Sequence, residues 1–189
     1  ISDCAPIWHR NSPSEHRTFL PIVHRGFSVA QPTPTATLSL GGFDSQFDHS
    51  ASGWEAHVGS WSVSDGVYWT EGVPAQFASA SYQGQYSDLD YQVRLAHYAS
   101  QARAIRLFIR GSPDPLWDTD KWSNGYAFQY ISDGRYSVWK YVDQQSIQVQ
   151  GWLYSSAINQ GDAWNTLRVV ANGAHMEYYI NGTEVWSGT

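Results

Sequence analysis

The sequence predicts an all-β protein, an antiparallel β-sandwich or jelly roll preceded by an extended N-terminal tail. Three observations carry this prediction. From residue 38 onward apolar and polar residues alternate with a period of two, glycine-containing turn signals recur between the alternating segments, and no window has the period of a helix. The 189 residues include ten Trp and twelve Tyr. This composition is typical of β-rich domains with an aromatic surface, and the regularly spaced strands with turns between them indicate the sandwich.

Residues 1–37 form the tail, and their composition differs from that of the rest of the chain. In residues 31–37 two prolines alternate with threonines, which biases the backbone toward an extended polyproline II conformation. Such linkers are common in exported proteins, and Thr33, Thr35 and Thr37 are candidate O-glycosylation sites. No charged-then-apolar leader is present, so we expect a targeting segment to have been removed. The expected location is therefore extracellular or at the cell surface.

One apolar run in the tail, residues 18–27, can form a strand. Its large apolar side chains are the predicted assembly residues: Phe19, Leu20, Ile22, Val23 and Phe27. Residues 1–40 contain three Arg against one Asp and one Glu, whereas the whole chain has a net charge of −6. This opposite charge favours docking of the tail on the remainder of the chain or on a neighbouring copy.

Residues 38–189 contain the strands of the sandwich domain. Strands are predicted at 88–95, 104–110, 125–130, 135–140, 167–171 and 175–180. Tight hairpin turns are predicted at Asp133-Gly134, Asn172-Gly173 and Asn181-Gly182, because glycine accepts a positive φ. Asn181-Gly182-Thr183 is also an N-glycosylation sequon, so Asn181 is a candidate modification site.

Short motifs follow one another in a set order along this region. They are Phe43-Asp44-Ser45-Gln46-Phe47, Gly59-Ser60-Trp61-Ser62-Val63-Ser64-Asp65-Gly66, residues 86–94, and residues 161–173 with 178–183. In this order they resemble the concanavalin A-like sandwich domains, which include the laminin-G-like and the 3-keto-disaccharide hydrolase-like families. The resemblance implies a jelly-roll fold and implies that Trp54, Trp61 and Trp164 belong to its framework. It does not imply one function, since this fold hosts lectins, adhesins, hydrolases and structural modules.

The resemblance also implies a difference at the end of the domain. Family members continue with further strands after the hairpin at Asn181-Gly182, whereas this sequence ends at Thr189. Two alternatives stay open: this sequence is a piece of a longer one, or another segment fills the missing sheet position, for which residues 18–27, from the same chain or from a neighbouring copy, are the candidate. Donation between copies would make the protein a homo-oligomer through its tail. Residues 19–25 also resemble a segment near the mature N-terminus of exported proteins from filamentous green bacteria.

Catalytic signals are weak in this sequence. Glycosidases of the concanavalin A-like group place their carboxylates on one strand, and the nearest pattern is Asp88-Leu89-Asp90, which lacks a Glu acid. We interpret it as an exposed polar face. No G-x-S-x-G motif is present, and Cys4 lies in the tail without a base motif nearby. The acidic chain without a basic run does not favour nucleic acid as a partner, and no apolar stretch is long enough for a transmembrane helix.

The best candidate ligand site is residues 112–125, a polar insertion between two predicted strands. Indole rings stack on the C–H faces of sugars, while carboxylate and amide groups bind their hydroxyls. The predicted carbohydrate-binding residues are Trp117, Asp118, Asp120, Trp122 and Asn124, with Trp139 and Trp152 on the following strands. Two alternatives stay open: Asp114, Asp118 and Asp120 could bind calcium, or the loop is solvated and its Trp residues pack back onto the sheet.

Together these observations predict an extracellular, non-catalytic β-sandwich module for adhesion or assembly at the cell surface, with glycan as its ligand. The first alternative is a structural subunit of a filament or surface layer that polymerises by exchange of its N-terminal segment. The second is a glycan-active hydrolase. No cofactor is expected apart from a possible calcium ion.

Overall fold

The computed structural model describes residues 17–21, 42–71, 76–84, 86–98, 104–112, 116–117 and 120–189, with the backbone alone for 17–21 and Tyr98. Every regular element within these ranges is a strand. The part of the chain that is described has no helix long and apolar enough to cross a membrane. Several predicted residues lie outside it: Ile22, Val23, Phe27, Thr33, Thr35, Thr37, Asp114 and Asp118.

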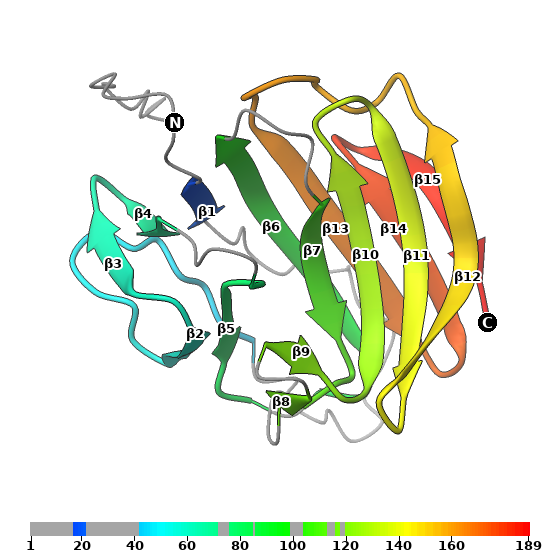
Figure 1. Ribbon diagram of the computed structural model, residues 1–189, viewed down its shortest axis with the longest axis horizontal. Helices are drawn as coiled ribbons and strands as arrows, with labels where there is room; N and C mark the ends of the chain where they lie inside the picture. Colours follow the sequence, from blue (N-terminus) through cyan, green and yellow to red (C-terminus); the bar gives the residue numbers. More distant parts are fainter. Residues whose placement is uncertain are drawn as a thin grey trace, which may run out of the picture.

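Two antiparallel sheets form the sandwich, as predicted, and Figure 1 shows them packed against each other. In the described residues the larger sheet has seven strands in the order β15-β14-β13-β6-β1-β4-β3. Their bounds are β1 (Arg17–Pro21), β3 (Trp61–Ser64), β4 (Val67–Thr70), β6 (Leu89–Tyr98), β13 (Asn165–Asn172), β14 (His175–Ile180) and β15 (Thr183–Gly188).

The smaller sheet has four strands within the described ranges, in the order β12-β11-β10-β7. They are β7 (Ala104–Ile109), β10 (Gly125–Ile131), β11 (Arg135–Val142) and β12 (Gln145–Tyr154). Two short pairs complete the fold: β2 (Trp54–Val58) with β5 (Ser79–Tyr82), and β8 (Leu116–Trp117) with β9 (Lys121–Trp122).

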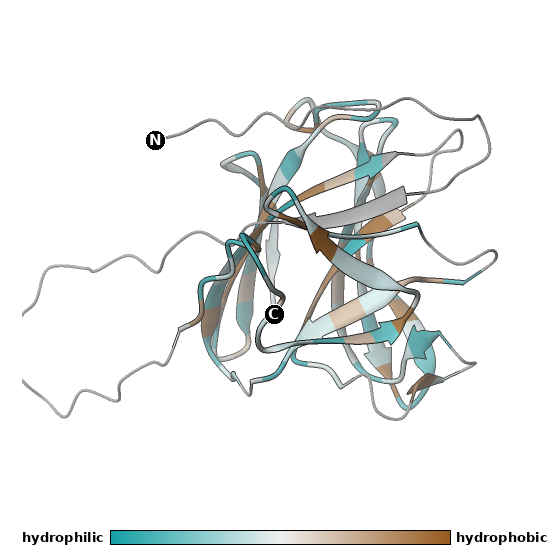
Figure 2. Ribbon diagram, turned by 90° about the vertical axis from the view of Figure 1, so that its left-hand side faces the viewer, coloured by the Kyte–Doolittle hydropathy of each residue, from teal (hydrophilic) through white to brown (hydrophobic). Residues whose placement is uncertain are grey.

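The core lies between the two main sheets and is built from every second residue of their strands. In β13, for example, Leu167 and Val169 are fully buried while Arg168 between them is partly exposed. Figure 2 shows polar and apolar residues alternating along the strands. Phe128 of the smaller sheet packs against Tyr178 of the larger one, with ring centroids 5.2 Å apart. Full burial of a large apolar side chain stabilises the fold by about 1.5–3 kcal/mol, so these residues hold the sheets together.

β1 occupies an interior position in the seven-stranded sheet. Its backbone pairs with β4, where Phe19 lies opposite Trp69, and with β6, where Phe19 lies opposite Ala96. Within the described sheet, β1 alone joins the β3–β4 hairpin to the remaining strands. The described strand ends at Pro21, so it covers Phe19 and Leu20 of the predicted assembly residues, and it belongs to the same chain as its neighbours.

A second aromatic cluster holds β2–β5 and β3–β4 together. Phe43 stacks on Tyr82 with ring centroids 3.6 Å apart, and Trp54 lies 6.2 Å from Tyr68. The indole nitrogen of Trp54 donates a hydrogen bond to Ser45 Oγ, and that of Trp61 donates to the carbonyl of Val58. Trp54 and Trp61 are therefore framework residues, as the family resemblance implied.

Three two-residue hairpin turns in the described chain have both central residues at positive φ, the type I′ conformation. They are Asp65-Gly66, Asp143-Gln144 and Asn181-Gly182. At Asn172-Gly173 the loop is Gly173-Ala174, and Gly173 alone has a positive φ, which is the type II′ pattern. The left-handed region costs a non-glycine residue roughly 1–2 kcal/mol, so Asp143-Gln144 is a strained turn.

Candidate functional site

The outer face of the four-stranded sheet, turned away from the core, carries polar and aromatic side chains. They are the residues that alternate with core positions: Arg106 and Phe108 of β7, Ala127 and Gln129 of β10, and Ser137, Trp139 and Tyr141 of β11. Gln129 is 2% exposed and Ser137 is fully buried. Polar groups buried to this degree need hydrogen-bond partners, and this face provides them.

A row of hydrogen bonds runs across three strands of this face. Arg106 Nε donates to Gln129 Oε1 at 2.6 Å, and Gln129 Nε2 donates to Ser137 Oγ at 2.7 Å. The indole nitrogen of Trp139 donates to the same hydroxyl oxygen at 3.0 Å. We call Arg106, Gln129, Ser137 and Trp139 the polar row. Gln129 lies directly opposite Arg106 on one side and Ser137 on the other, and Trp139 is two residues from Ser137 on the same face of β11, so the sheet itself holds their geometry.

Arg106 places a largely desolvated positive charge at one end of the polar row. Burial lowers its pKa, while the charges of Tyr141 and Asp120 act in the opposite direction. The ring of Phe77 lies over the guanidinium at 4.0 Å, and Asp120 Oδ2 accepts a hydrogen bond from the Phe77 amide at 2.7 Å. No carboxylate among the described residues forms an ion pair with Arg106. No described residue accepts a hydrogen bond from the terminal nitrogens Nη1 and Nη2 of Arg106.

The β8–β9 hairpin covers the end of this face that lies near the start of β10. Trp122 stacks on Phe108 with ring centroids 4.9 Å apart and is 9% exposed. Its indole nitrogen is buried without a hydrogen-bond partner among the described residues. Lys121 Nζ lies 4.9 Å from the centroid of the Trp117 ring. Trp122 and Asp120, which is 6% exposed, are therefore structural residues that pack against this face. Their burial leaves no open surface on which a sugar ring could stack.

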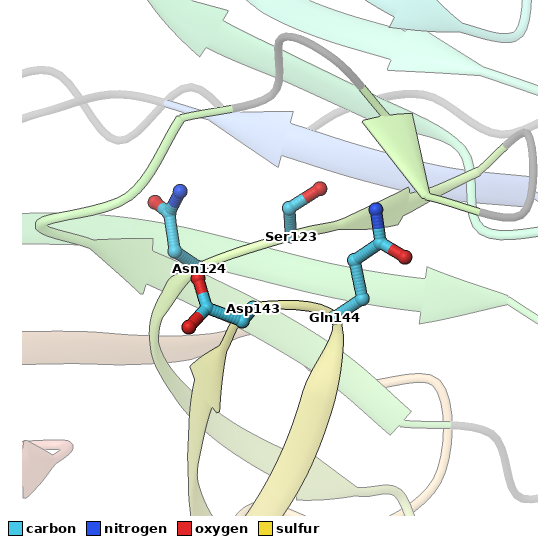
Figure 3. A pocket seen from close by; sticks show the side chains of 4 residues that line it. All are labelled: Ser123, Asn124, Asp143 and Gln144. Atoms are coloured by element: carbon cyan, nitrogen blue, oxygen red, sulfur yellow. The ribbon is translucent and has the colours of Figure 1, made fainter.

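A pocket of about 240 Å³ opens beside this hairpin, lined by Ser123, Asn124, Asp143 and Gln144 (Figure 3). Two segments meet there, the entry to β10 and the turn between β11 and β12. The amide of Gln144 donates to the carbonyl of Ser123 at 3.0 Å, and Asn124 Oδ1 accepts from the amide of Ser112 at 2.9 Å. A hydroxyl, two carboxamides and a carboxylate therefore line one small cavity.

The sequence-predicted site residues separate in the structure. Asn124 lines the pocket, and Trp139, which is partly exposed, belongs to the polar row. Trp152 lies elsewhere on β12, with Arg135 Cζ 5.9 Å from its ring. Asp143 and Gln144 were not predicted, because their turn lacks the glycine or asparagine that marks a hairpin turn in a sequence. A run of polar residues between two strands was the pattern that could have indicated them.

The calcium prediction rests mainly on residues outside the described chain, Asp114 and Asp118. The third predicted ligand, Asp120, is buried and accepts the hydrogen bond from Phe77. The residues that the structure describes contain no group of three or more His, Cys, Asp or Glu side chains arranged to hold a metal ion. Calcium binding stays a prediction.

The carboxylates of Asp88 and Asp90 are engaged in structural contacts. Asp90 accepts two hydrogen bonds of 2.6 Å from Arg168, and Asp88 accepts from Arg110 at 3.3 Å and from the Gly173 amide at 2.9 Å. Both aspartates are exposed. The interpretation of this pair as an exposed polar face is confirmed.

Asn181, the predicted N-glycosylation site, uses its side chain inside the fold. Its Nδ2, the atom that a glycan would join, donates to the carbonyl of Ala157 and to Asn165 Oδ1, both at 2.7 Å. Its Oδ1 accepts from the amide of Thr166 at 2.8 Å. Glycosylation would replace one of the two Nδ2 protons that Asn181 donates in these hydrogen bonds.

Two comparisons with known proteins agree with the fold. Among solved structures, the chain is similar to the carbohydrate binding module CBM66 from Bacillus subtilis, with 16% sequence identity and a TM-score of 0.54 over 71% of this chain and 78% of that one. At this identity the likeness shows a shared fold. No curated protein matches the chain. A family model described as the 3-keto-alpha-glucoside-1,2-lyase-like domain matches residues 42–189, which confirms the 3-keto-disaccharide hydrolase-like part of the resemblance found in the motifs. Since this match spans far more than half of the sequence, the chain belongs to the 3-keto-alpha-glucoside-1,2-lyase-like domain family.

Proposed function

We propose that this protein is a non-catalytic β-sandwich module that binds carbohydrate on the outer face of its four-stranded sheet. The observation that carries the proposal is that the buried Gln129 and Ser137 of the polar row fix two partly exposed groups on this face, the guanidinium of Arg106 and the indole ring of Trp139. Sugars present hydroxyl edges and C–H faces, so a site for them needs donors, acceptors and an aromatic surface together. The names of the matched family and of the similar module both refer to sugars, which supports this ligand class.

The family membership favours a second candidate, a lyase or hydrolase that acts on a sugar. Such chemistry requires a general base, and commonly a second carboxylate, in contact with the substrate. The described pocket contains one carboxylate, that of Asp143, and both Asp88 and Asp90 are paired with arginines. Binding without turnover is therefore the function that we propose first. Products released from a bound glycan by the parent protein would favour the enzyme.

We place this binding outside the cell, in adhesion or assembly at the surface. The Pro/Thr linker between β1 and the sandwich domain supports export, because linkers of this composition are common in exported proteins. β1 supports an assembly role, since a strand that reaches the sheet through a long connection can be exchanged between identical copies. A filament or surface-layer subunit built by this exchange is the structural alternative.

Calorimetric titration of the parent protein with soluble polysaccharides tests the binding proposal. Trp139→Ala removes the aromatic surface of the polar row, and we expect it to weaken binding by about tenfold or more, as for a central interface aromatic. Tyr179→Ala is the matched control, because Tyr179 is a partly exposed aromatic on the outer side of the other sheet, under Arg168. Its affinity should equal that of the parent. Failure of the parent protein to bind any polysaccharide would overturn the proposal.

A further inference from the structure

The turn between β11 and β12 differs from the other type I′ hairpins of the described chain in one position. The turns Asp65-Gly66 and Asn181-Gly182 have glycine second, whereas this one has Gln144. Gln144 has a φ of 68° and Asp143 a φ of 46°. Aspartate tolerates the left-handed region, but a long side chain such as glutamine rarely adopts it. A glycine at residue 144 would form the same turn without this strain.

The strained residue lies where the pocket is. Gln144 and Asp143 line the cavity opposite Ser123 and Asn124, as Figure 3 shows. The hydrogen bond from the Gln144 amide to the Ser123 carbonyl ties the turn to the opposite wall. Neither the Gln144 nor the Asp143 side chain has a hydrogen-bond partner among the described residues, so the fold does not use their polar atoms. Strain of this kind at a cavity wall points to a role in function.

We infer that Gln144 is a ligand-contact residue, and that the pocket takes the hydroxyl-bearing edge of one neutral sugar unit. This inference rests on the proposed function. The carboxamide of Gln144 can donate to one hydroxyl and accept from another, and the Asp143 carboxylate can accept from a neighbouring hydroxyl. The pocket of about 240 Å³ is smaller than the roughly 300–1,000 Å³ of pockets for drug-sized ligands, so we infer that it takes one sugar unit and not several.

The charge of the pocket selects against acidic sugars. Asp143 is the one ionisable residue among its four lining residues, and the chain as a whole carries a net charge of −6. A uronate carboxylate would approach Asp143 with like charge, and no arginine or lysine lines the cavity to offset the repulsion. A hydroxyl group, which donates to a carboxylate, has no such penalty.

The test exchanges glutamine and glycine between two turns of the same type. Gln144→Gly should raise the melting temperature by about 2–4 °C, because it relieves the strain, and should weaken binding of the best neutral glycan by about three- to tenfold, because one neutral hydrogen bond is lost. Gly182→Gln is the control: Gly182 has a φ of 81° and open space around it, and its turn is tied to Thr166 at the opposite end of the sheets. It should lower the melting temperature without changing affinity.

The probes are soluble neutral glucans, fructans, galactans and mannans, together with polygalacturonate as the acidic member. Equal affinity of Gln144→Gly and the parent would overturn the ligand-contact role, and so would a melting temperature that does not rise. Tighter binding of polygalacturonate than of every neutral glycan would overturn the ligand class alone. Absence of binding by the parent to all probes would overturn the proposed function, and this inference with it.

Discussion

At the scale of single residues, Gln129 is the central member of the polar row. Its carboxamide accepts from Arg106 and donates to Ser137, so one side chain satisfies two buried polar groups. Gln129→Ala would leave the Arg106 Nε and the Ser137 hydroxyl without these partners and would open a small cavity. An unsatisfied buried group costs about 1–3 kcal/mol, and we expect the melting temperature to fall by about 4–10 °C. Gln148→Ala, an exposed glutamine opposite Trp139, should change the stability by less than about 0.5 kcal/mol. Thermal unfolding of the two variants compares them directly, and equal melting temperatures would show that the polar row does not stabilise the sheet.

At the scale of elements, β1 connects parts of the larger sheet that otherwise do not pair. Phe19 lies opposite Trp69 on one side and Ala96 on the other, so its amide belongs to one of the two hydrogen-bond ladders. Proline has no amide proton, and in the middle of a sheet it removes a ladder bond. Phe19→Pro should therefore lower the melting temperature and expose the edges of β4 and β6, which favours association of chains. Thermal unfolding and light scattering measure both effects. A variant as stable and as monodisperse as the parent would contradict a structural role for β1.

Strands and core could be predicted from the sequence because burial of one sheet face imposes a period of two. The polar row could not, because Gln129 and Ser137 alternate with core residues and so have the pattern of solvent-facing positions. Cross-strand hydrogen bonds satisfy the polar atoms of Gln129 and Ser137, and Phe77 and Trp122 come from other segments to cover Arg106 and Phe108. Asn124 was predicted as a site residue because its loop is polar. Asp143 and Gln144 were missed because Gln144 stands where a type I′ turn favours glycine. The same departure from residue preference marks the turn as a candidate functional position.

At the scale of the whole molecule, assembly by strand exchange requires that the position of β1 between β4 and β6 accept a strand from another copy. In the structure the strand comes from the same chain, and residues 22–41 connect it to the domain. A tethered strand binds at an effective concentration in the millimolar range, so binding within one chain competes strongly with exchange.

A Phe19→Pro chain should have this position free, and a synthetic peptide of residues 14–24 should then bind there and raise the melting temperature. At a peptide concentration 100 times its Kd the gain is about 2.7 kcal/mol, or roughly 5–10 °C for a chain of this size. The same peptide with proline at residue 19 is the control and should have no effect. If the native peptide also leaves the melting temperature unchanged, the sheet does not accept β1 from outside, and assembly by strand exchange is excluded.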